Sequence, residues 1–299
     1  MKDSEVLATV SEHSGFVRFP LWLRHIRYNK QHFGFDYTMQ NLGLEMFKKP
    51  AVVMAGGPAF EAFGFLPGLK AIFSAKKRLG LNVIAADVAL PYLAQQGFQP
   101  DLVCSVDAHP VVANFYRRSH NILPGLKVAL PANIHRDVVN ECLSHEARVY
   151  WWQPMWHREM RDRFRVNDLP SFQTGGNVGT TAFVFSLYKQ CDPIGLFALE
   201  FSWSDETPMV TTDFYKSIRR ATGNALLGPE RLRFQKVRNG RNGLTYLADP
   251  TYLYYRDLFR ELWQNLKPEI REKVWLLNKQ GILSAPGLRY KSVAEFLRG

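Results

Sequence analysis

Two glycine-rich turns are the parts of this sequence best suited to holding a phosphate group. One follows an apolar run at residues 56–58, and the other directly precedes a long apolar segment at residues 173–181. Glycine lets backbone N–H groups approach a ligand closely, and the free N–H groups at a helix N-terminus attract anions. The residues that we predict to bind nucleotide phosphates are Gly56, Gly57, Pro58, Gly175, Gly176, Asn177 and Thr180. A plain helix cap is the alternative for the second turn.

Three acidic side chains each follow a short apolar run of the kind that forms a buried strand. They are Asp87, Asp107 and Glu200. Ligands of parallel sheets bind at the edge where the strands end, so we expect these carboxylates to face one site. Asp87 and Asp107 are predicted to be catalytic and, if the reaction uses a metal, to hold Mg²⁺. Asp87 and Glu200 are also predicted to contact the nucleotide.

His109 is the candidate general base because it lies two residues beyond Asp107. An imidazole exchanges protons near neutral pH, which suits the removal of a proton from an acceptor hydroxyl. The alternative is a structural role beside the start of a helix. Cys104, Cys142 and Cys191 lie in apolar runs, so we assign them no nucleophilic role.

These residues need a framework that brings distant turns together, and an alternation of apolar runs with helical patterns supplies it. Strands are predicted at 51–57, 82–87, 101–107, 127–131, 148–152 and 194–200. Helices are predicted at 60–79 with a break near Pro67-Gly68, and at 88–96, 110–118 and 178–190. Continuous apolar strands interleaved with helices indicate an α/β fold: a Rossmann-like, mostly parallel sheet with helices on both faces.

The positive charge of the chain is concentrated near its C-terminus. The 299 residues have a formal net charge of +11, and residues 206–299 alone carry seventeen basic and nine acidic side chains. Residues 51–205 are nearly neutral at a net +1. We expect an N-terminal extension over 1–48, a nucleotide-binding core over 49–205 and a basic C-terminal region over 206–299, packed on the core. Both extensions are expected to be mainly helical.

The basic region is predicted to bind an anionic partner through Arg231, Arg233 and Lys236. A positive patch of this kind suits phosphate, an acidic sugar, or a glycan or protein acceptor that carries negative charge. A solvated face without a partner is the alternative. Nucleic acid is not favoured, because no recognition motif accompanies the cluster.

The composition excludes several classes of protein. With 46% apolar and 13% aromatic residues the chain is not disordered, and three cysteines are too few for a disulfide-stapled scaffold. No apolar run approaches the ~18 residues of a membrane span, and the first residues lack the pattern of a signal peptide. We therefore expect a cytoplasmic location.

Three motifs, in order, resemble a single protein family. They are Gly-Gly-Pro-Ala-Phe at 56–60, the run from Val83 to Asp107, and the segment 174–182 with its continuation at 191–203. The family is the domain shared by archaeal 6-hydroxymethyl-dihydropterin diphosphokinases and bacterial motility accessory factors. The resemblance covers about residues 48–205 and implies a nucleotide-binding fold similar to that of bacterial sialyltransferases.

Individual positions match the family to different degrees. Asp87, Asp101 and Asp107 match aspartates of the family, while Glu200 stands where an aspartate is usual and Ala59 where a serine is usual. The C-terminal segment at 278–283 resembles an Asn-Cys-Thr-Glu-Gly-Gly segment of the longer members, without its threonine and glutamate.

The resemblance implies a nucleotide-dependent transferase and leaves three interpretations open. Motility accessory factors are implicated in adding sialic-acid-like sugars to flagellin, so the first is a glycosyltransferase that uses a CMP-activated nonulosonic sugar. The second is a diphosphokinase that moves diphosphate from ATP, with Mg²⁺, to 6-hydroxymethyl-dihydropterin. The third is an inactive nucleotide-binding scaffold. The large basic C-terminal region favours sugar transfer, because an acidic acceptor or an anionic sugar suits a positive surface.

Overall fold

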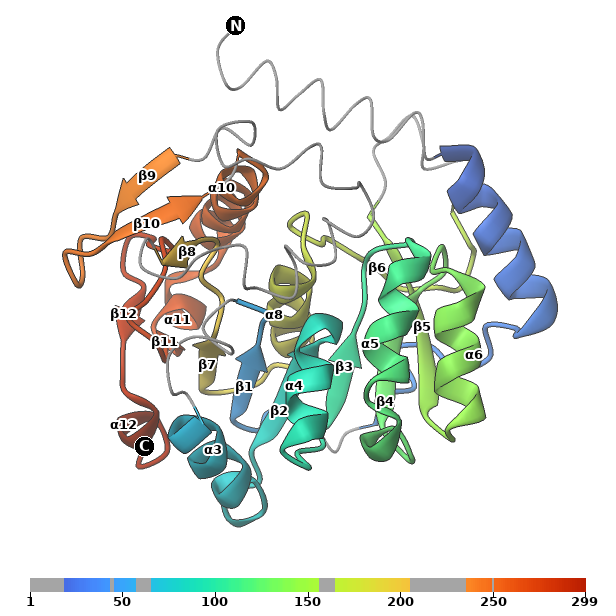
Figure 1. Ribbon diagram of the computed structural model, residues 1–299, viewed down its shortest axis with the longest axis horizontal. Helices are drawn as coiled ribbons and strands as arrows, with labels where there is room; N and C mark the ends of the chain where they lie inside the picture. Colours follow the sequence, from blue (N-terminus) through green and yellow to red (C-terminus); the bar gives the residue numbers. More distant parts are fainter. Residues whose placement is uncertain (1–18, 44–45, 58–65, 156–164, 205–234, 249) are drawn as a thin grey trace, which may run out of the picture.

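A parallel sheet of nine strands forms the centre of the structure, a computed structural model that describes residues 19–43, 46–57, 66–155, 165–204, 235–248 and 250–299 (Figure 1). Its strands, in sheet order, are β12 (Arg289–Tyr290), β11 (Val274–Leu276), β7 (Ile194–Phe197), β1 (Ala51–Met54), β2 (Asn82–Ala86), β3 (Leu102–Cys104), β4 (Lys127–Pro131), β5 (Arg148–Pro154) and β6 (Ser171–Phe172). All neighbouring pairs are parallel. This arrangement confirms the predicted α/β fold with its mostly parallel sheet.

The strand order reverses at β1. From β1 the chain adds β2 to β6 successively on one side, and then returns to place β7 against the other side of β1. Val52 of β1 is therefore paired with Val83 of β2 and with Gly195 of β7. In open α/β sheets such a reversal leaves a crevice between the loops at the carboxyl ends of the two central strands.

Helices cover both faces of the sheet, as Figure 1 shows. One face carries α3 (Leu66–Leu79), α4 (Leu90–Gln95), α5 (Ala113–Arg117), α6 (Arg136–Ser144) and α12 (Val293–Phe296), and the other carries α8 (Val178–Tyr188) and α10 (Pro250–Asn265). Short 3₁₀ helices are η2 (Asp87–Ala89), η3 (Pro110–Val112) and η4 (His120–Ile122), and α11 (Pro268–Arg271) precedes β11. Side chains alternate between the faces, so Val52 and Met54 belong to one core while Ala51 and Val53 belong to the other.

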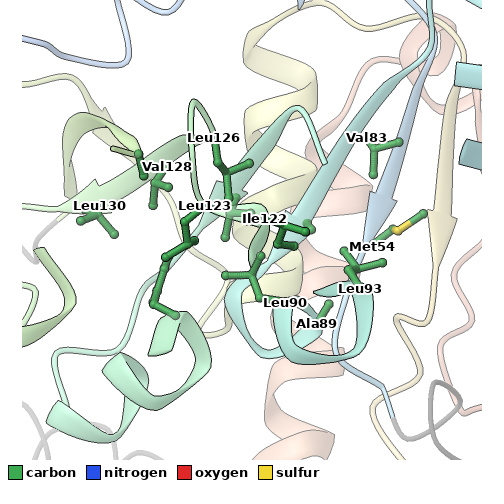
Figure 2. Close-up of a cluster of buried hydrophobic side chains, with 14 of the residues drawn as sticks. Met54, Val83, Ala89, Leu90, Leu93, Ile122, Leu123, Leu126, Val128 and Leu130 are labelled. Atoms are coloured by element: carbon green, nitrogen blue, oxygen red, sulfur yellow. The ribbon is translucent and has the colours of Figure 1, made fainter. Parts of the chain in front are cut away.

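The two cores explain why the strands read as continuous apolar runs. Figure 2 shows the first core, where side chains of β1, β2, β4 and α4 pack together, among them Met54, Val83, Leu93 and Val128. In the second core α8 lies between the sheet and α10, and its Phe183 packs against Phe259 of α10 with ring centroids 5.5 Å apart. A helix enclosed on both sides is apolar all round, as its sequence is.

The N-terminal extension is held on the core by a helix over residues 19–32. Ile26 of this helix joins the first core. The Asn29 side chain donates hydrogen bonds to the carbonyls of Ala132 and Ile134, at 3.0 and 2.9 Å, just beyond the end of β4. The helix thus covers the carboxyl edge of the sheet at β4.

Sequence and structure differ at several elements. α3 begins at Leu66 and includes Pro67 and Gly68, because a proline in the first turn lacks only an N–H that has no helical acceptor anyway; residues 60–65 of the predicted helix lie outside the described residues. The short strand β6 was not predicted. The C-terminal region contributes β11 and β12 to the central sheet in addition to its helices.

A second, antiparallel sheet lies at the side of the molecule near α10 (Figure 1). It contains β8 (Trp203–Ser204), β10 (Thr245–Ala248) and β9 (Gln235–Arg238), in that order. In the part of the chain that the structure describes, none of the helices has both the length and the apolar character needed to cross a membrane.

Replacing Leu93 with alanine should lower the free energy of unfolding by about 2–5 kcal/mol, because it empties a fully buried site. The matched control is Leu143→Ala on α6, whose side chain is 48% exposed and should cost at most about 0.5 kcal/mol. Chemical denaturation followed by circular dichroism measures both. Equal losses in the two variants would contradict the place of Leu93 in the core.

Candidate functional site

The loops that follow β1 and β7 touch at the crevice between these strands. The N–H of Gly57 donates a hydrogen bond to the carbonyl of Ala198 at 2.9 Å. A Cβ atom on Gly57 would lie 2.5 Å from that carbonyl oxygen and 2.9 Å from Oε2 of Glu200. Only glycine fits this close approach. The first glycine turn and the Glu200 carboxylate therefore lie side by side, as expected from the sequence.

The second glycine turn forms the start of α8. Gly175 and Gly176 have φ angles of +56° and +76°, which favour glycine. Asn177 is the N-cap: its Oδ1 accepts the Thr180 N–H at 2.9 Å, and its Nδ2 donates to the Thr180 hydroxyl at 2.8 Å. The plain cap is therefore present, and the hydroxyl of Thr180 is buried within it.

The cap does not exhaust the donors at the start of α8. The first turn of a helix leaves N–H groups without an intrahelical acceptor. For those of Val178 and Gly179, no acceptor occurs among the residues that the structure describes. A Cβ on Gly179 would lie 2.7 Å from Leu199 and 2.8 Å from Ala55, so this end of α8 sits directly over the crevice. Unpaired N–H groups and a helix dipole at this point suit a phosphate.

Glu200 is held by a segment far along the chain. The side chain of Asn278 donates to Oε1 of Glu200 at 3.2 Å and accepts the N–H of Ala198 at 2.9 Å. The N–H of Ile282 donates to the carbonyl of Glu200 at 2.9 Å, and Gly281 packs so closely that a Cβ there would lie 2.6 Å from the Cα of Glu200. The sequence analysis assigned no role to Asn278. The resemblance of residues 278–283 to a segment of the family was the one feature that could have pointed to it.

The backbone around Glu200 is strained. Ala198 and Phe201 have φ angles of +56° and +54°, a region that non-glycine residues rarely adopt. Such conformations persist only where the surroundings hold them, and they gather at functional sites. Asn278 supplies part of that hold, because it bonds both to Ala198 and to Glu200.

Asp87 lies beside the first glycine turn and is almost fully buried, with 4% of its surface exposed. A Cβ on Gly56 would overlap the side chain of Val88, which places the two segments in contact. The pKa of Asp87 is raised to about 7: burial is the main cause and the nearby Asp107 adds to it, whereas hydrogen bonds from Ser105 and the Val88 N–H lower it. The carboxyl group therefore exchanges its proton near neutral pH.

Asp107 and His109 are exposed at the end of β3. Oδ1 of Asp107 accepts the N–H of His109 at 3.0 Å, and Nδ1 of His109 accepts the N–H of Val111 at 3.1 Å. In the neutral ring that acceptor role puts the proton on Nε2, so the imidazole acts here as the cap of η3. The general-base role of His109 stays a prediction.

Asp87 and Asp107 are close enough to interact electrostatically, and both could contribute to a magnesium site. Within the described ranges no group of three or more histidine, cysteine or acidic side chains is arranged to hold a metal. Mg²⁺ is commonly bound by one or two carboxylates together with substrate phosphates. The two aspartates fit that pattern only with a phosphate in the crevice.

The remaining predicted residues lie apart from this crevice or outside the described ranges. Pro58, Arg231 and Arg233 fall on segments that the structure does not describe. Lys236 is exposed on β9. Its role toward an anionic partner stays a prediction.

Comparison with known proteins identifies a family and, among the solved structures that match, a glycosyltransferase with a similar fold. The family model described as "6-hydroxymethylpterin diphosphokinase MptE-like" matches residues 24–206. The structure of the Maf glycosyltransferase from Magnetospirillum magneticum AMB-1 superposes with a TM-score of 0.61 and 14% sequence identity, over 83% of this chain and 34% of that one. The present chain thus spans about a third of that protein, and the likeness is one of fold. Among curated protein sequences none matches.

Replacing Asn278 with alanine should destabilise the protein by about 1–3 kcal/mol, because the Ala198 N–H and the Glu200 carboxylate lose a buried partner. Gln280→Ala, in the same segment, is the control and should change the unfolding free energy by no more than about 0.5 kcal/mol. Urea denaturation compares the two. An Asn278→Ala protein as stable as the control would show that Asn278 does not hold the loop.

The raised pKa of Asp87 should make stability fall as pH rises from about 4 to about 7. In that window the folded chain keeps a proton that the unfolded chain has released, so each pH unit favours unfolding by up to about 1.4 kcal/mol. Asp87→Asn, which is neutral throughout, should lack this component. Denaturation of both proteins across the pH range measures the difference, and parallel pH profiles would refute the raised pKa.

Proposed function

The chain belongs to the 6-hydroxymethylpterin diphosphokinase MptE-like family, and on that premise we propose that it is a nucleotide-dependent transferase that uses a CMP-activated, sialic-acid-like nonulosonic sugar. The observation that carries the proposal is the convergence of the Gly57 turn, the start of α8 and Glu200 at one crevice of the sheet. Such crevices take phosphate-bearing ligands in this class of fold. The sugar is favoured because a glycosyltransferase shares the fold and because the C-terminal region is basic.

The start of α8 suits the phosphate of the donor. In sugar transfer the bond between the anomeric carbon and a phosphate oxygen breaks, so negative charge grows on the departing phosphate. Val178 and Gly179 lie in the first turn of α8 beside Ala55 and Leu199, so their N–H groups are suited to stabilise that charge. Gly175 and Gly176 add no side chain of their own to the turn, and a Cβ on Gly176 would lie 2.8 Å from the ring of Tyr255.

The proton of the acceptor hydroxyl needs a base at the open edge of the site. Asp107 and His109 are exposed there, whereas Asp87 lies beneath them in the interior. Asp107 keeps an oxygen beyond the one that accepts the His109 N–H, which suits it to take the proton. Asp87, with a pKa of about 7, sets the local charge beside it.

The acceptor is proposed to approach over the basic C-terminal region, through Lys236 and the predicted Arg231 and Arg233. The described cysteines are buried and unpaired, which fits the proposed reducing, cytoplasmic location. The two alternative functions are diphosphate transfer from ATP and an inactive nucleotide-binding scaffold. The experiments below distinguish them from sugar transfer.

A pair of variants at Asn177 separates phosphate binding from helix capping. Aspartate and serine both cap helices well, but aspartate adds a negative charge where the phosphate should lie. Asn177→Asp should weaken binding of CMP by about tenfold or more, corresponding to about 1.4 kcal/mol, while Asn177→Ser stays close to the parent protein. Isothermal titration calorimetry measures these affinities.

The same titrations, run with CMP and with ATP in the presence and absence of Mg²⁺, identify the nucleotide. CMP binding without metal supports sugar transfer. If ATP binds only with Mg²⁺ and CMP does not bind, the result would favour diphosphate transfer over sugar transfer. Absence of any nucleotide binding would refute both transfer reactions.

A further inference from the structure

The turn of the β9–β10 hairpin contains a guanidinium group, that of Arg241, whose Nε has no hydrogen-bond partner among the residues that the structure describes. Arg241 is half-buried, and its Nε is enclosed by protein with no hydrogen-bond acceptor. Within the described ranges no carboxylate forms an ion pair with it, although seven such pairs occur elsewhere. A buried cationic donor left unpaired is costly, so each case calls for an explanation.

A second hydrogen-bond donor, the hydroxyl of Tyr246, lies near Arg241. Tyr246 of β10 is almost fully buried, and its hydroxyl oxygen accepts a hydrogen bond from the side chain of Asn242 at 2.8 Å. The hydroxyl proton of Tyr246 meets no acceptor among the residues that the structure describes. The phenol of Tyr246 and the guanidinium of Arg241 lie close enough to interact electrostatically.

The turn that carries these donors is firmly held. The Asn239 side chain accepts the N–H of Arg241 at 2.7 Å and donates to the carbonyls of Lys279 and Gly281. Asn242 donates to the same Lys279 carbonyl at 3.1 Å. The backbone of the turn is therefore ordered before any ligand arrives, which lowers the conformational entropy that the protein loses on binding.

We propose that Arg241 and Tyr246, whose hydroxyl is positioned by Asn242, form a binding site for an oxyanion, the carboxylate or phosphate group of a small ligand. An oxyanion supplies what the site lacks: negative charge for the guanidinium, and acceptor oxygens for the Nε–H and the tyrosine hydroxyl. Arginine binds such groups through two parallel hydrogen bonds, and a tyrosine donor adds a third. A neutral acceptor would leave the charge uncompensated.

The site is connected to the crevice through one segment of chain. Asn239 holds the carbonyl of Gly281, and Gly281 packs against the backbone of Glu200. Figure 1 shows the hairpin beside β11 and β12, at the side of the sheet where β7 lies. The oxyanion site is a separate site from the proposed nucleotide crevice and does not require that crevice to bind a nucleotide.

The Nε–H resonance of Arg241 provides a direct test. In ¹H–¹⁵N spectra of the full chain this signal is identified by its loss in Arg241→Gln. Inorganic phosphate and glucuronate are titrated separately at constant ionic strength, so that a phosphate and a sugar carboxylate are compared. The signal should shift saturably with at least one of them, and the stronger of the two identifies the ligand class.

Affinities of the variants complete the test. Arg241→Gln should weaken binding of that anion at least tenfold, and Tyr246→Phe, which removes only the hydroxyl, several-fold. The control is Arg238→Gln, an exposed arginine of the same hairpin, which should retain the parent affinity. Without anion, Arg241→Gln should melt no lower than the parent, because it removes an unpaired charge. An Arg241 signal that both anions leave unmoved, or equal weakening by Arg238→Gln, would overturn the proposal.

Discussion

The close approach of two backbone loops at the centre of the sheet is the constraint on which the site depends. Gly57 after β1 donates to the carbonyl of Ala198 after β7, with no room for a Cβ between them. This approach sets where Glu200 must lie and which end of α8 can cover the opening. A side chain at residue 57 would separate the loops and, with them, the groups proposed to hold phosphate.

The C-terminal region takes part in this arrangement. Asn278 bonds to both ends of the strained loop after β7, and β11 pairs with β7 in the sheet. The basic hairpin is tied to the same segment through Asn239. Neighbouring contacts therefore connect the core with the loop at residues 198–201, and that loop with the β9–β10 hairpin. Such a series offers a physical route by which an anion at the hairpin could affect the position of Glu200.

Much of this could be predicted from the sequence, for identifiable reasons. Buried parallel strands are continuous apolar runs, so β1, β2 and β4 are recognisable in the sequence. Since the carboxyl ends of parallel strands lie at one edge of the sheet, Gly57, Asp87 and Glu200 are expected on the same side. The strands β6, β11 and β12 have two or three residues each, too few for a pattern. The role of Asn278 depends on a contact eighty positions away. Likewise, the density of arginines marks the hairpin but does not separate the exposed Arg238 from the half-buried Arg241.

The central claim is that the N–H groups at the start of α8 bind the phosphate of a nucleotide. Backbone ¹H–¹⁵N spectra recorded during titrations with CMP and with cytidine test it most directly, since the two differ only in the phosphate. The account predicts large, saturable shifts of the Val178 and Gly179 amides with CMP and much smaller ones with cytidine. Saturable binding of CMP that leaves these two amides unmoved would contradict it.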